Sequence, residues 1–167
     1  LMLILLPEGL FRGLHGRYVF HLLLGAVSMF LLARMLSLSR PAAFVAAAAF
    51  MLNGHVIGTD HVNRLACFMH IPLVFLAVYR LFDRPHIIWA VLLGGAFGSQ
   101  LGSYHPQIAH YTGMMLGLYV VYMVITHLRD REPVRPLLMS CGLFGLALGL
   151  AAAISAVMVM PMQEYAR

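Results

Sequence analysis

Six long apolar runs, separated by short polar or charged segments, most constrain what this chain can fold into. They cover roughly residues 18–36, 41–56, 65–82, 86–101, 106–127 and 136–160. About 20 apolar residues in an α-helix are long enough to cross the ~30 Å hydrocarbon core of a bilayer. Because the runs are continuous, and not short stretches of alternating residues, we expect helices and not the strands of a membrane barrel.

The composition agrees with a membrane protein. Hydrophobic residues make up 62% of the chain, charged residues 10%, and the mean hydropathy is +0.87, against roughly 45–50% and 25% in soluble domains. We therefore predict an all-α polytopic membrane protein with about six transmembrane helices. Residues 1–17 would form an outer loop or interfacial segment, 18–160 the transmembrane domain, and 161–167 an outer tail. The sequence shows no signal-peptide pattern. Because the chain begins without Met and ends straight after an apolar run, we expect it to be an excerpt from a longer polypeptide.

The arginines predict the orientation in the membrane. All eleven basic residues are Arg, and seven of them fall in the turns that join the runs in successive pairs. The remaining four lie on the opposite side, so the positive-inside rule makes the Arg-rich turns cytoplasmic. The polar segments 53–64 and 102–107 then lie outside the cytoplasmic membrane. These loop arginines account for the basic pI, and no nucleic-acid partner is expected.

The first polar segment brings together an acid, a histidine and an arginine. Asp60 or His61 could take a proton from an acceptor or ligate a metal. Arg64 could hold a phosphate, because its planar guanidinium donates two parallel hydrogen bonds. Alternatively, Asp60 and Arg64, four residues apart at the start of a helix, simply pair and cap that helix. Both interpretations remain open.

The second polar segment precedes another helix. Pro106 suits the first turn of a helix, where its missing N–H has no partner to lose, so we expect a helix to begin there. Tyr104, His105 and Gln107 are the predicted substrate-binding or phosphate-binding residues of this segment. Lipid offers such side chains no partner, which indicates a wet cavity or a protein contact.

Histidines are the candidate metal ligands. His55 and His110 could bind a divalent metal ion if the two polar segments meet in space. Histidines at a membrane interface also bond backbone carbonyls or water, which is the simpler interpretation. His21 and His70 lie inside apolar runs, where a buried imidazole could ligate haem or a chlorophyll magnesium. The motif for covalent haem attachment, Cys-x-x-Cys-His, does not occur in the sequence.

Short landmarks occur along the chain in a fixed order. They are Leu-x-x-Arg-x-Leu-x-Leu-Ser-Arg at 31–40, Asn53-Gly54-His55, His61-x-Asn63, Ile71-Pro72-Leu73, His105-Pro106-Gln107 with Tyr111, and Pro161-x-x-Glu164. This order of landmarks resembles the YfhO family of bacterial membrane proteins. The likeness extends from about residue 18 to residue 167, which is nearly the whole chain.

The resemblance implies a bundle of the GT-C glycosyltransferase type. Such proteins move a sugar from a polyprenyl-phosphate donor to an acceptor on the outer side of the bacterial cytoplasmic membrane. They generally carry an essential acidic residue in the first outer loop, and this chain is expected to begin beyond that loop. Glu8 is the nearest acid, and nothing around it marks it as the equivalent residue.

Two functions from different classes follow. The first is a segment of a membrane glycosyltransferase, with the bilayer and a lipid-linked sugar as its partners. The second is a non-catalytic helical subunit or scaffold of a larger membrane complex, which could hold a cofactor through histidine, since a fold does not fix a function. A transporter is less favoured, because most of the runs lack an ionisable residue at mid-membrane depth.

Overall fold

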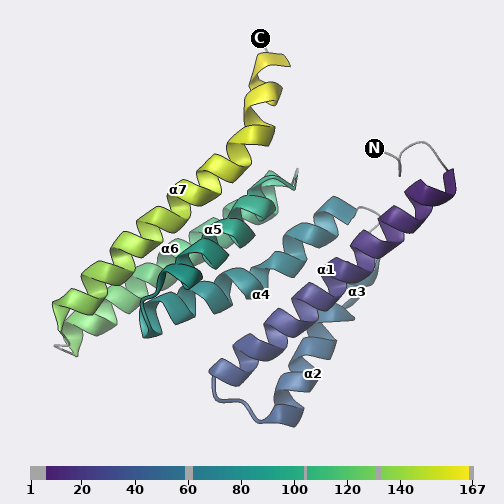
Figure 1. The fold of residues 1–167 in the computed structure, drawn as a ribbon. Helices are drawn as coiled ribbons and strands as arrows, with labels where there is room; N and C mark the ends of the chain where they lie inside the picture. The colour runs from purple at the N-terminus through teal and green to yellow at the C-terminus, as the bar shows by residue number, and fades with distance from the viewer. Residues whose placement is uncertain (1–6, 59–61, 104, 131–132, 166–167) are drawn as a thin grey trace. The chain divides into compact units, whose positions relative to one another are not determined.

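The computed structural model describes residues 7–58, 62–103, 105–130 and 133–165, and over these residues its regular secondary structure is entirely α-helical. The helices are α1 (Pro7–Met35), α2 (Arg40–Met51), α3 (Gly54–Ile57), α4 (Val62–Asp83), α5 (Ile87–Leu101), α6 (Pro106–Arg129) and α7 (Val134–Tyr165) (Figure 1). The chain divides into two compact units, Leu1–Pro72 and Leu73–Arg167. The boundary falls within α4, at the proline inside that helix. The all-helical prediction is confirmed.

Four helices are long and apolar enough to cross a membrane. These candidate spans are His15–Met35, Val62–Asp83, Pro106–Arg129 and Val134–Val157. Helices α2 and α5 are also apolar, but they have only 12 and 15 residues. At 1.5 Å per residue they are about 18 and 23 Å long, less than a hydrocarbon core of ~30 Å. A membrane-associated helical protein is therefore supported, whereas the six spans that the sequence predicts are not confirmed.

Asn53 explains why α2 is shorter than its apolar run, which the sequence extends to about residue 56. Its Nδ2 donates to the carbonyl oxygen of Phe50 at 2.6 Å, and its Oδ1 accepts the N–H of Val56 at 3.0 Å. Asn53 is thus the N-cap of the four-residue helix α3. Asparagine favours such caps because its side chain competes for nearby backbone groups.

The outermost helices are longer than the sequence predicts. The expected loop or interfacial segment within 1–17 is helical from Pro7 and continuous with the spanning part of α1. Proline fits this first position because its ring fixes a helical φ angle. At the other end, α7 passes the expected stop at Pro161 and continues to Tyr165. Apolar helices tolerate an internal proline when the freed carbonyl finds another partner.

Unit 1 has a small apolar core around the start of α4. Val56, Leu65 and Met69 are buried, and the side chains of Tyr18, Leu22, Phe50 and Phe68 pack against them. Helices α1 and α2 lie side by side in this unit (Figure 1). In the alanine-rich α2, Ala43 and Ala47 are buried, while Phe44 is 68% exposed.

Unit 2 depends on a close, parallel packing of α5 against α7. A Cβ atom added to Gly94 would lie 2.7 Å from the carbonyl oxygen of Ala147, and one added to Gly98 would lie 3.0 Å from the Cα of Ala151. These two glycines let α5 approach α7 closely, whereas a Cβ on Gly95 would meet nothing within 4 Å.

Two hydrogen bonds join neighbouring helices near their ends in unit 2. The Ser140 hydroxyl donates to the carbonyl oxygen of Leu81 at 3.0 Å, which joins the start of α7 to the end of α4. Gln100 Nε2 donates to Thr112 Oγ1 at 2.9 Å, which joins the last turn of α5 to α6. Within unit 2, the turn between α4 and α5 therefore lies at one end, and the turn between α5 and α6 lies at the other.

We predict that Gly94→Ala destabilises the protein and that Gly95→Ala does not. The new methyl group at position 94 would collide with the backbone of α7, and overpacking of this kind costs about 1–3 kcal/mol. The methyl group at position 95 enters open space, where alanine is about 1 kcal/mol better than glycine in a helix. The free energy of unfolding, measured by SDS titration of the purified protein in mixed micelles, checks both. Equal stabilities would contradict the packing of α5 on α7.

Candidate functional site

A groove at the start of α6 is the candidate site within unit 2. Its volume is about 560 Å³, and it is lined by Leu101, Pro106, Gln107, His110, Tyr111 and Ser155. The first of these ends α5, the next four belong to the first two turns of α6, and Ser155 is on α7. Three helices therefore line the groove. Its polar groups are one amide, one imidazole and two hydroxyl groups, and the other lining side chains are apolar.

The start of α6 combines two features that suit a polar or anionic ligand. Pro106 occupies the first turn, and His105, the N-cap, makes no side-chain capping bond. The first N–H groups of the helix therefore keep the partial positive charge of a helix N-terminus, which favours anions. Gln107 Nε2 donates to Tyr111 Oη at 3.3 Å, one helical turn away, and this bond orders both side chains.

A buried amide fixes the helices beneath this site. The Gln100 side chain is fully buried, and its bond to Thr112 ties α5 to α6. Thr112 Oγ1 in turn donates to the carbonyl oxygen of Ile108 at 3.0 Å. A buried hydrogen bond of this kind is expensive to break, because the group left behind has no water to bond. It fixes the last turn of α5 relative to the second turn of α6, the two helices whose ends meet at the groove.

The structure brings some of the predicted site residues together. Gln107 and His110 both line the groove, and His105 is the adjacent N-cap of α6. Arg64 is half-buried in the first turn of α4, in unit 1. Asp60, His61 and Tyr104 lie outside the described residues, so their predicted roles stay predictions.

The predicted metal ligands are not joined by any described contact. His55 belongs to α3 in unit 1, and its side chain lies outside the described atoms, whereas His110 belongs to unit 2. Among the side chains that the structure describes, no group of three or more His, Cys, Asp or Glu is placed to hold a metal ion. A metal held by His55 and His110 remains a prediction.

Leu101, Tyr111 and Ser155 line the groove but were not predicted from the sequence as site residues. Ser155 could have been found from the pattern of α7, because Ala147 and Ala151 contact α5 and the next position four residues on is Ser155. Helical residues four apart share a face. This inference requires knowing that α5 packs against α7, and the sequence alone does not show that packing.

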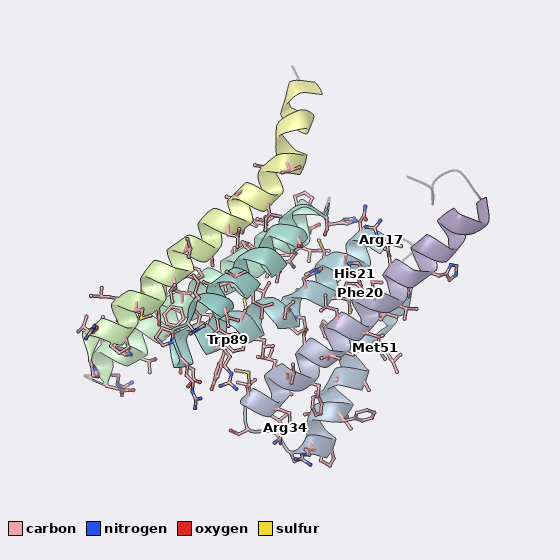
Figure 2. The ribbon with its side chains drawn as sticks, in the orientation of Figure 1. Arg17, Phe20, His21, Arg34, Met51 and Trp89 are labelled. Atoms are coloured by element: carbon pink, nitrogen blue, oxygen red, sulfur yellow. The ribbon has the colours of Figure 1, made fainter. Side chains whose placement is uncertain are left out.

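A second polar feature lies in unit 1, where the rings of His21 and His70 approach each other. Their centroids are 5.8 Å apart, and Figure 2 labels His21 on α1 beside Phe20. Each Nδ1 lies 2.6 Å from a backbone carbonyl oxygen four residues earlier, that of Arg17 or Ala66. A carbonyl only accepts, so Nδ1 carries the proton and Nε2 keeps a lone pair. The pair therefore offers two acceptor nitrogens from two helices.

No protein-family model, curated protein or solved structure matches the chain. The groove and the histidine pair of this chain are therefore the features from which a function can be inferred.

We predict that Thr112→Val lowers the stability of unit 2, whereas Thr126→Val does not. The first change removes the acceptor of the buried Gln100 amide, and leaving a buried donor without its bond costs about 1–3 kcal/mol. Thr126 bonds only the carbonyl of Tyr122 within its own helix, so its loss is local. Thermal unfolding of the two variants in detergent measures the difference, and a Thr112→Val protein as stable as the Thr126→Val control would contradict the proposed role of the Gln100 bond.

Proposed function

We propose that this chain is part of a membrane glycosyltransferase that moves a sugar from a polyprenyl-phosphate donor to an acceptor outside the bacterial cytoplasmic membrane. The observation that carries the proposal is the groove at the start of α6. Its volume of about 560 Å³ lies within the usual range of small-molecule sites. The order of sequence landmarks described above supports the same conclusion.

The chemistry of the groove suits each part of such a donor. Gln107, Tyr111 and Ser155 supply the amide and hydroxyl groups that hydrogen-bond sugar hydroxyls. The N-terminus of α6 favours a phosphate, because its first N–H groups point out of the helix. Leu101 and Pro106 add apolar surface for a prenyl chain.

The chemical step needs a base for the acceptor hydroxyl and positive charge for the departing phosphate. We assign the base to Asp60 or His61, and the phosphate contacts to Arg64 and His105. Tyr104 is assigned to substrate binding with Gln107. A divalent metal ion could share the phosphate charge.

We expect Gln107→Ala and Tyr111→Phe each to lower sugar transfer about tenfold, the effect of losing one hydrogen bond to a bound sugar. The variants are tested in membranes that contain the protein, with a panel of radiolabelled polyprenyl-phosphate sugars and with transfer to membrane acceptors as the readout. Tyr122→Phe is the matched control, because Tyr122 is on the same helix, is 61% exposed and does not line the groove.

Two outcomes would count against the proposal. Transfer by the unaltered protein that survives both groove substitutions would remove the groove from the active site. No transfer from any donor in the panel, with the protein folded and inserted, would count against the glycosyltransferase function itself. Asp60→Ala, tested in the same assay, should abolish transfer if Asp60 is the base.

The histidine pair favours a second candidate function, that of a helical subunit which holds a cofactor. His21 and His70 come from different helices of unit 1, and their ring centroids are 5.8 Å apart. The backbone bonds to Nδ1 orient each ring, as outer-shell partners do in many metal sites. A divalent metal with water as its further ligands fits this arrangement.

We predict that the purified protein binds Zn²⁺ and that His21→Gln and His70→Gln each weaken the binding by about tenfold or more, since each removes one of two protein ligands. Isothermal titration of the detergent-solubilised protein measures the dissociation constant. His110→Gln is the control, because His110 lies in unit 2. Binding that is lost with His110→Gln and kept with the other two variants would instead support the predicted ligand His110.

A further inference from the structure

The turn between α4 and α5 forms a recess on the Arg-rich side of unit 2. Its volume is about 530 Å³, and it is lined by Arg80, Arg84, Pro85, His86 and Trp89. The recess lies at the opposite end of unit 2 from the groove at the start of α6. In the sequence, the arginines of this turn served only to predict the orientation of the helices in the membrane. The proposed function does not involve the turn.

The recess carries more positive than negative charge. Asp83 Oδ2 lies 3.2 Å from Arg80 Nη1 and 3.8 Å from Arg84 Nε, so one carboxylate serves two guanidinium groups. The Arg84 side chain is 83% exposed and keeps most of its donors directed to the surroundings. A net charge of about +1 therefore remains, and an arginine fork matches the geometry of a phosphate.

The first turn of α5 adds to the attraction for an anion. His86 is the N-cap, and its Nδ1 accepts the N–H of Ile88 at 3.2 Å. In the neutral ring the proton then sits on Nε2, which is a further donor at the recess. The N-terminal end of α5 contributes partial positive charge at the same place.

Trp89 places the recess at the boundary of the membrane. The Arg80 guanidinium carbon lies 6.0 Å from the centroid of the Trp89 ring, a cation–π contact that holds both side chains (Figure 2 labels Trp89). Tryptophan is enriched where the headgroups meet the hydrocarbon. The candidate span in α4 ends at Asp83, directly beside this turn.

Exposed apolar residues continue from the recess along α5. Ile88 is 61% exposed and Val91 is 53% exposed, one turn apart on the same face. A small soluble anion would gain nothing from contact with these exposed apolar side chains. A phospholipid would use both parts, because its phosphate matches the arginines and its acyl chains match the isoleucine and valine.

We propose that the α4–α5 turn binds an anionic phospholipid, with Arg84 and Arg80 holding the headgroup phosphate, Trp89 at the glycerol level and α5 against an acyl chain. Basic pockets at the cytoplasmic ends of membrane helices are suited to such headgroups. This site is independent of the proposed sugar transfer. Its consequence is that the first turn of the 15-residue helix α5 is anchored at the level of the lipid headgroups.

Trp89 is the only tryptophan in the sequence, so its fluorescence reports on this site. The protein is reconstituted into phosphatidylcholine vesicles that contain increasing amounts of either dibromo-phosphatidylglycerol or dibromo-phosphatidylcholine, whose bromine atoms quench nearby tryptophan. We expect phosphatidylglycerol to bind about fivefold more tightly than phosphatidylcholine, the effect of one arginine at an anionic headgroup. Equal quenching by the two lipids would overturn the proposal.

Variants separate a specific site from general attraction to a charged membrane. Arg84→Gln should abolish the preference, and its high exposure means that folding does not depend on it. Arg129→Gln is the matched control, because Arg129 is an exposed arginine in the last turn of α6 that does not line the recess. Equal loss in both variants would overturn the site. Inorganic phosphate is added to phosphatidylcholine vesicles as a separate arm, and a change in Trp89 fluorescence there would assign the recess to a free anion and overturn the lipid.

Discussion

The close approach of α5 to α7 at Gly94 and Gly98 is the contact on which the rest of unit 2 depends. In a membrane, lipid tails are as apolar as the side chains, so helices gain little from burying apolar surface against each other. Association depends instead on van der Waals contact between backbones, which requires a helix face without Cβ atoms. Helix α5 has only 15 residues and meets this requirement at two positions one turn apart. Its place in the unit is therefore set by α7 and not by its own length.

The two sites of unit 2 follow from this parallel packing. Because α5 and α7 run in the same direction, the end of α5 meets the C-terminal half of α7, which brings Leu101 and Ser155 to one groove. The start of α5 is turned toward the other end, where Arg80 and Trp89 meet across the α4–α5 turn. The buried bond from Gln100 to Thr112 fixes α6 against this frame. The groove and the recess at the α4–α5 turn therefore lie at opposite ends of unit 2.

Sequence patterns predicted the features that local chemistry controls. The apolar runs gave the helices, and Pro106 marked the start of α6 within one residue. The end of α2 was missed, because an apolar run shows where a helix is tolerated while the Asn53 side chain decides where it stops. In the candidate site, Gln107 was predicted as a substrate-binding residue because it lies in a polar segment at a helix start, whereas His110 was predicted only as a metal ligand. Ser155 was not predicted, since its position depends on the register between α5 and α7, and register is a property of packing.

Polar residues inside these apolar helices are mostly satisfied by their own backbone, which limits what their presence can signify. Thr112, Thr126 and Ser103 each donate to the carbonyl oxygen four residues earlier. His70 uses Nδ1 in the same way. A hydroxyl group bonded like this already donates its proton to the backbone of its own helix. It therefore needs no ligand in order to be buried in lipid. An imidazole is different, because one ring nitrogen satisfies the backbone while the other keeps a lone pair. The number of polar residues in these helices therefore exceeds the number of ligand-binding sites. The better candidates for such sites are polar atoms that do not already bond the backbone of their own helix.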